Sequence, residues 1–123
     1  MEKSEWKKIG RISRYGEALQ ITYHDSIGGE EHTYFIIKSA VKRLIEKGIP
    51  AEVSDIEIND PNTVLIVSRG TAARSKSGNA LIINTPRQAG IMCPWSSLLK
   101  LARGEMRTAP LSITRAPLRR EMV

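Results

Sequence analysis

The sequence predicts an α+β fold, with a mixed, mostly antiparallel sheet of about five to six strands covered by two helices. Short apolar segments, several of them alternating with polar residues, are separated by turns that contain glycine or proline. Residues 30–47 and 94–103 instead place apolar side chains at helical spacing. The chain of 123 residues, 41% hydrophobic and 26% charged, has the size and composition of one globular domain.

The first expected element is a β-hairpin near the N-terminus. Residues 6–13 alternate loosely between apolar and polar side chains, and residues 18–23 alternate clearly. Gly16 lies between these segments, where a tight turn can require a positive φ. A polar break over residues 24–29 follows the hairpin.

Residues 30–47 are expected to form a long helix that packs on the sheet. Its apolar side chains recur at intervals of three and four residues, as on one face of a helix: Tyr34, Ile37, Val41, Leu44 and Ile45. Gly48 is typical of the residue that follows a helix C-terminus. We therefore expect this helix to be indispensable to the core.

Three further strands are expected after this helix. Residues 51–58 and 79–84 are rich in aliphatic side chains, and residues 63–67 form a continuous apolar run. Such a run is typical of a strand buried on both faces. Residues 68–78 form an expected polar loop.

A second helix is expected over residues 94–103. Pro94 suits its start, because proline has no N–H to leave unsatisfied in the first turn. We therefore assign residues 1–104 to a single α+β domain and residues 105–123 to a basic extended tail. Within this tail, residues 111–114 could add a short edge strand.

The charge is distributed unevenly around a formal net value of +6. Residues 17–62 carry nine acidic and four basic side chains, whereas residues 63–123 carry ten basic and two acidic side chains. This asymmetry suits a protein that binds a polyanion through one face. It equally suits basic and acidic segments that contact each other, within the fold or in a homo-oligomer.

Cysteine content and hydropathy narrow the class of protein. A single cysteine excludes an intramolecular disulfide and a Cys₂His₂ zinc site within one chain. No apolar run approaches the roughly 18 residues that suggest a membrane span. We therefore expect a cytoplasmic protein that does not associate with membranes. We predict no cofactor and no metal site.

The loop over residues 68–78 is the strongest candidate for ligand binding. It combines basic side chains with hydroxyls and glycines and lacks acidic residues, and these groups bind phosphate oxygens. Basic residues of the first hairpin would enlarge this patch if the two hairpins were neighbours. The expected nucleic-acid-binding residues are Arg11, Arg14, Arg69, Arg74 and Lys76. The alternative is a solvated connection whose polarity serves solubility.

A pocket containing His24, Asp25 and Cys93 is a second candidate site. His24 and Asp25 follow a predicted strand, and Cys93 precedes a predicted helix, whose dipole would lower a thiol pKa. Cys93 could then act as a nucleophile with a histidine as its base. The alternative is that Cys93 is a small buried apolar side chain. The sequence contains no evidence that these groups meet.

Two segments of the chain have a similar pattern. Residues 13–21 and 75–83 each contain a basic turn with glycine, followed by Ala-Leu-x-Ile. The pattern indicates either an internal duplication or two independent hairpins that use the same turn chemistry.

The leading functional expectation is a non-catalytic module that binds a polyanion, with nucleic acid as the expected ligand, through basic hairpin loops and the tail. The first alternative is a structural or assembly subunit that binds an acidic protein. The second is a small enzyme that uses Cys93 or His24. The sequence does not identify a family, and it leaves the ligand and the oligomeric state open.

Overall fold

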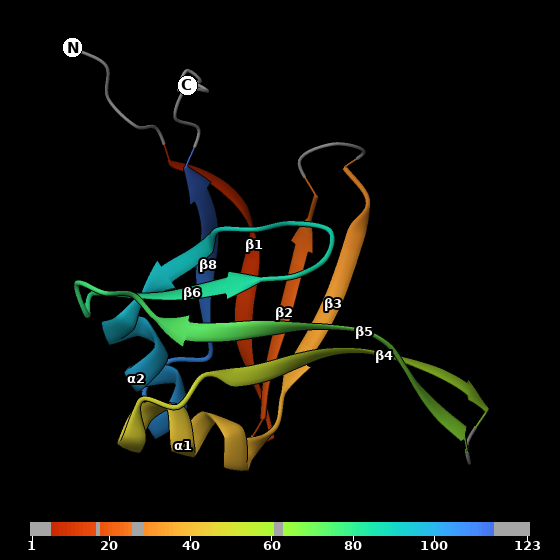
Figure 1. Ribbon diagram of the computed structural model, residues 1–123, viewed down its shortest axis with the longest axis horizontal. Helices are drawn as coiled ribbons and strands as arrows, with labels where there is room; N and C mark the ends of the chain where they lie inside the picture. Colours follow the sequence, from red (N-terminus) through yellow and green to blue (C-terminus); the bar gives the residue numbers. More distant parts are fainter. Residues whose placement is uncertain (1–5, 17, 26–28, 61–62, 115–123) are drawn as a thin grey trace.

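The protein is a closed barrel of eight strands, in which each strand is antiparallel to its neighbours and β1 pairs with β8 (Figure 1). The computed structural model describes residues 6–16, 18–25, 29–60 and 63–114, without the side chains of residues 6–7, 56–60, 63–67 and 114. In chain order the elements are β1 (Trp6–Tyr15), β2 (Ala18–His24), β3 (Glu31–Ile36), α1 (Lys38–Lys47), β4 (Ala51–Asp60), β5 (Thr63–Arg74), β6 (Ala80–Asn84), β7 (Ile91–Pro94), α2 (Trp95–Arg103) and β8 (Thr108–Thr114).

The expected open sheet of five to six strands covered by two helices is wrong. The sheet has eight strands and closes on itself, and the helices lie near one end of the barrel rather than over a sheet face (Figure 1). Closure depends on pairing between the first and the last strand. The local pattern of residues carries no signal for such a contact.

The expected helix over residues 30–47 is divided into a strand and a shorter helix. In β3, His32, Tyr34 and Ile36 are buried and alternate with more exposed residues, which is the period of a strand. This segment pairs with β2 over six residues. Its β-branched and aromatic side chains favour a strand over a helix. Only α1 is helical, and it ends at Gly48, which has a φ of 69°.

The expected polar loop over residues 68–78 is mostly strand. β5 continues to Arg74 and pairs with β6 from Thr71 to Arg74, so that the connection to β6 is short. Gly70 allows β5 to pass close to the end of β6, since a Cβ atom at this position would lie 2.2 Å from the Asn84 carbonyl oxygen. The polar sequence therefore forms the outer face of a strand.

β8 lies beyond the expected domain boundary at residue 104. Its pairing with β1 runs from Thr108 opposite Ser13 to Thr114 opposite Trp6. The segment that the sequence suggested as tail therefore includes a barrel strand. Residues 115–123, the rest of the expected tail, lie outside the described residues.

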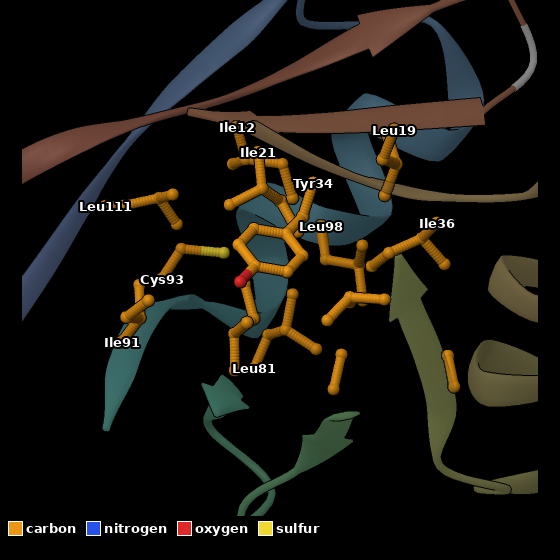
Figure 2. Close-up of a cluster of buried hydrophobic side chains, with 14 of the residues drawn as sticks. Ile12, Leu19, Ile21, Tyr34, Ile36, Leu81, Ile91, Cys93, Leu98 and Leu111 are labelled. Carbon is orange, nitrogen blue, oxygen red and sulfur yellow. The ribbon is translucent and has the colours of Figure 1, made fainter. Parts of the chain in front are cut away.

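The barrel interior is filled by side chains and forms the core. Aliphatic residues from both sides of the barrel surround Tyr34, and Cys93 lies among them (Figure 2). α2 contributes Leu98 and Leu101, both fully buried, to the same core. It occupies the range expected for the second helix and begins directly after Pro94.

The chain consists of two units that share one order of elements. Strands β1–β3, α1 and β4 form the first unit, and β5–β7, α2 and β8 form the second. The described glycines fall into four pairs that occupy equivalent places in the two units: Gly10 and Gly70, Gly16 and Gly78, Gly29 and Gly90, Gly48 and Gly104. The two similar sequence segments correspond to the β1–β2 and β5–β6 hairpins. This agreement favours duplication over chance.

Candidate nucleic-acid interface

Arg14 lies at the end of β1, where it contacts the C-terminal end of α2. Its Nη1 atom donates to the Leu101 carbonyl oxygen at 3.3 Å, and its Nε atom donates to the Gly16 carbonyl oxygen at 3.1 Å. A cation is favourable at a helix C-terminus, where the carbonyl groups present partial negative charge. Arg14 is therefore positioned by the backbone while its side chain remains exposed to solvent.

Two hollows adjoin at Arg14. One, of about 260 Å³, lies between the helices and has Lys38, Lys42 and Glu46 among its lining residues. The other, of about 790 Å³, is lined partly by Arg103 and Arg107.

We call the five basic residues of these hollows the Arg14 patch: Arg14, Lys38, Lys42, Arg103 and Arg107. All five are exposed, and one acidic residue, Glu46, lines the same hollows. The second hollow also has the hydroxyls of Ser13 and Thr108, which lie 3.1 Å apart. Guanidinium, ammonium and hydroxyl groups are the donors that phosphate oxygens accept.

The basic residues expected on β5 and its loop occupy a different part of the surface. Arg69 forms an ion pair with Glu52, with 3.4 Å between Nε and Oε2. Arg74 packs over the ring of Trp95 at the start of α2 and donates from Nε to the Gly78 carbonyl oxygen. Lys76 is exposed in the connection between β5 and β6.

The structure does not bring the β1–β2 hairpin next to Arg69, Arg74 and Lys76. β1 and β5 lie on opposite sides of the barrel, so Arg11 and Arg14 are separated from Arg69. Arg14 and Arg74 contact opposite ends of α2. The five expected binding residues therefore form two groups, and their role in binding stays a prediction.

Cys93 lies in the core and lacks the setting of a nucleophile. It is 2% exposed, and burial raises the pKa of its thiol to about 12. A thiol with such a pKa is protonated near neutral pH, whereas nucleophilic attack requires the thiolate. Cys93 also lines a hollow of about 500 Å³ beside β7 and β8, to which neither histidine contributes.

The other members of the expected pocket lie at the β2–β3 hairpin. His24 is exposed and pairs in register with Glu31. Asp25 instead contacts His32, with 2.8 Å between Oδ2 and Nε2. The structure thus places Asp25 with His32 and leaves Cys93 elsewhere.

Two tyrosines carry hydroxyl groups into the barrel. The Tyr23 hydroxyl lies 2.6 Å from Thr85 Oγ1, and the Tyr34 hydroxyl lies 2.8 Å from Ser68 Oγ. The two rings stack with their centroids 6.2 Å apart. Burial raises the pKa of Tyr23 to about 12, which keeps its hydroxyl protonated. These groups order the core.

The chain matches no protein-family model, no curated protein and no solved structure. Within the described residues, neither helix has the length and apolar character needed to cross a bilayer.

Sequence reasoning found Arg14 but missed the rest of its patch. Lys38 and Lys42 fall in the first predicted helix, Arg103 in the second and Arg107 in the predicted tail. The available signal was the excess of basic side chains on both predicted helices. What brings them together is the barrel, which sets both helices at the same end (Figure 1).

Proposed function

We propose that this protein is a non-catalytic nucleic-acid-binding module and that the Arg14 patch contacts the phosphate backbone. The observation that carries the proposal is the pair of hollows that adjoin at Arg14, with five basic residues and one acidic residue between them. We also propose that the protein is located in the cytoplasm.

Physical reasons support a polyanion rather than a single small anion. The basic groups extend from α1 across β1 to the segment that follows α2, and they are spread over two hollows. A string of phosphates can contact such a surface at several points and release counterions at each contact. Arg14 is held by backbone carbonyls, so less side-chain entropy is lost when it binds a phosphate.

The test is a salt titration of labelled duplex and single-stranded oligonucleotides, followed by fluorescence anisotropy. The variant carries K38Q, K42Q, R103Q and R107Q, and it keeps Arg14 because of its contacts with α2. Each lost phosphate contact should flatten the slope of log K against log salt by about 0.9 on duplex DNA. The variant should therefore lose up to roughly 3.6 units of slope, with little change among oligonucleotide sequences.

A charge-matched variant separates this patch from general basicity. It carries K8Q, R69Q, K76Q and R87Q, all exposed in the structure and outside the Arg14 patch. We expect it to keep most of the parent slope. An equal loss of slope in both variants would show that net charge alone causes the effect. A larger loss of slope in the matched variant would assign the interface to the surface around β5. Absence of parental binding at low salt would overturn the proposal in favour of an acidic protein partner.

A further inference from the structure

Three potential metal ligands converge at the β2–β3 hairpin. Asp25, Glu30 and His32 each offer one ligand atom, and these atoms all lie within 4.8 Å of one another. Arg14 pairs with Leu19 at the other end of β2, so this cluster is remote from the Arg14 patch. The inference therefore goes beyond the proposed function and does not depend on it.

Within the cluster, the side chains of Asp25 and His32 form a hydrogen bond. His32 Nε2 and Asp25 Oδ2 are 2.8 Å apart, and both side chains are largely buried, with 8% and 12% exposed. When the imidazole proton lies on Nε2 it is donated to this carboxylate, whereas in the other neutral tautomer Nε2 carries a lone pair that can bind a metal ion. Two ligands that each lie about 2.05 Å from one metal are roughly 2.9 Å apart when they subtend about 90° at the metal, and roughly 3.3 Å apart at the tetrahedral angle.

Glu30 adds a third potential ligand to this hydrogen-bonded pair. A proton joins one nitrogen to one oxygen, whereas a metal ion also uses the Glu30 carboxylate. Asp25 Oδ2 is the only hydrogen-bond partner that His32 has among the described residues, although the ring is nine-tenths buried. We propose that Asp25, Glu30 and His32 bind one divalent transition-metal ion through one imidazole nitrogen and two carboxylates.

The hairpin holds Asp25 and His32 in place before a metal arrives. The Asp25 N–H donates to the Glu30 carbonyl oxygen at 3.0 Å, and the Gly29 N–H donates to Asp25 Oδ1 at 3.1 Å. The His32 ring packs against the Tyr23 ring, with 5.4 Å between their centroids. Glu30 is exposed, so an ion can enter from the solvent on its side.

The donor set identifies the class of metal. Imidazole nitrogen suits Zn²⁺, Fe²⁺ and Ni²⁺, whereas a site for Mg²⁺ or Ca²⁺ would use oxygen ligands. Three protein ligands leave at least one coordination position for water.

The experiment titrates the full chain with Co²⁺, followed by its visible absorption, and with Zn²⁺, followed by calorimetry. We expect saturation at one ion per chain and preference of Zn²⁺ over Mg²⁺ by at least a hundredfold. Asp25→Asn should abolish the signal, and Glu30→Gln should weaken binding by at least tenfold. Because Asp25 lies in the hairpin, circular dichroism and thermal melting must first establish that each variant is folded.

Glu31→Gln is the matched control, because Glu31 is the exposed neighbour of Glu30 and belongs to the register pair with His24. It should leave the affinity unchanged within twofold. An equal loss in Glu31→Gln and Glu30→Gln, or loss of the signal in His24→Ala, would assign binding to the exposed surface and overturn the site. A parent chain without saturable Co²⁺ or Zn²⁺ binding would also overturn it.

Discussion

Tyr23 and Thr85 occupy equivalent places in the two units of the chain, and their side-chain oxygens meet at 2.6 Å inside the barrel. Each lies opposite a glycine on the neighbouring strand. Gly10 pairs with Tyr23, and Gly70 lies against the backbone of Thr85. Thr85 donates its hydroxyl hydrogen to the Gln88 carbonyl oxygen, so Tyr23 is the donor to Thr85. This hydrogen bond, like the one between Tyr34 and Ser68, ties the two units together.

We predict that Tyr23→Phe lowers the free energy of unfolding by about 1–2 kcal/mol. The change removes the donor and leaves Thr85 Oγ1 without this buried partner. Urea unfolding followed by tryptophan fluorescence measures the difference. Tyr15→Phe is the control, because Tyr15 is 61% exposed and its hydroxyl should contribute little. Equal effects of the two changes would contradict the role of the Tyr23–Thr85 bond.

We predict that Cys93 makes the protein less stable as the pH rises above about 9. Burial raises the pKa of the folded thiol from 9.0 to about 12, so above pH 9 the unfolded chain releases a proton that the folded chain keeps. The stability that the buried, protonated thiol contributes is therefore fully present below the pKa of the thiol in the unfolded chain. It is lost as the pH rises towards 12, at up to roughly 1.4 kcal/mol per pH unit.

The measurement compares urea unfolding of the parent and of Cys93→Ala at pH 7, 9 and 10. The free energy of unfolding of the variant should decline less between pH 9 and 10, and Tyr23, whose pKa burial raises from 10.0 to about 12, affects both proteins alike. Parallel curves for the two proteins would refute this account, whatever their offset at pH 7.

We predict that truncation after Gly104 prevents cooperative folding. It removes β8, which pairs with β1 over seven residue positions and contributes the buried side chains of Ala109, Leu111 and Ile113. Truncation after Thr114 retains all eight strands and serves as the control. Differential scanning calorimetry distinguishes them: a cooperative transition in the shorter chain would show that β8 is dispensable.

We predict that residues 1–62 and 63–123 assemble into the native barrel when they are produced as separate chains. β4 pairs with β5, and β8 pairs with β1, so each unit gives its last strand to the sheet of the other. Within a unit, the pairs β3–β4 and β7–β8 share one register position each. Neither fragment should fold alone. Co-purification with a cooperative melt supports the prediction, and an independently folded fragment would contradict it.

The sequence predicted the parts of the fold that local patterns control. The β1–β2 hairpin follows from alternation around Gly16, and α2 follows from the apolar spacing after Pro94. β3 was missed because its apolar residues run directly into those of α1, so that two periods overlap in one segment. β5 was missed beyond Val67 because one side of that strand is polar and its other side uses small residues such as Ala72.

The candidate sites were less predictable, because one depends on contacts between distant segments and the other on the pairing of two strands. The Arg14 patch combines residues of β1 and α1 with residues beyond α2, which the closed barrel brings to one end. Asp25 and His32 are close in sequence, but their contact requires that residues 31–36 form a strand paired with β2. Once that segment is assigned to a helix, the contact cannot be predicted.

The pairing of Trp6 with Thr114 has a mechanical consequence. The first and the last strand run antiparallel as neighbours, so the start of β1 and the end of β8 lie at the same edge of the barrel (Figure 1). Tension applied between the ends would therefore peel β1 from β8 one hydrogen bond after another instead of shearing all of them together. In this direction the closed barrel should yield to a small pulling force.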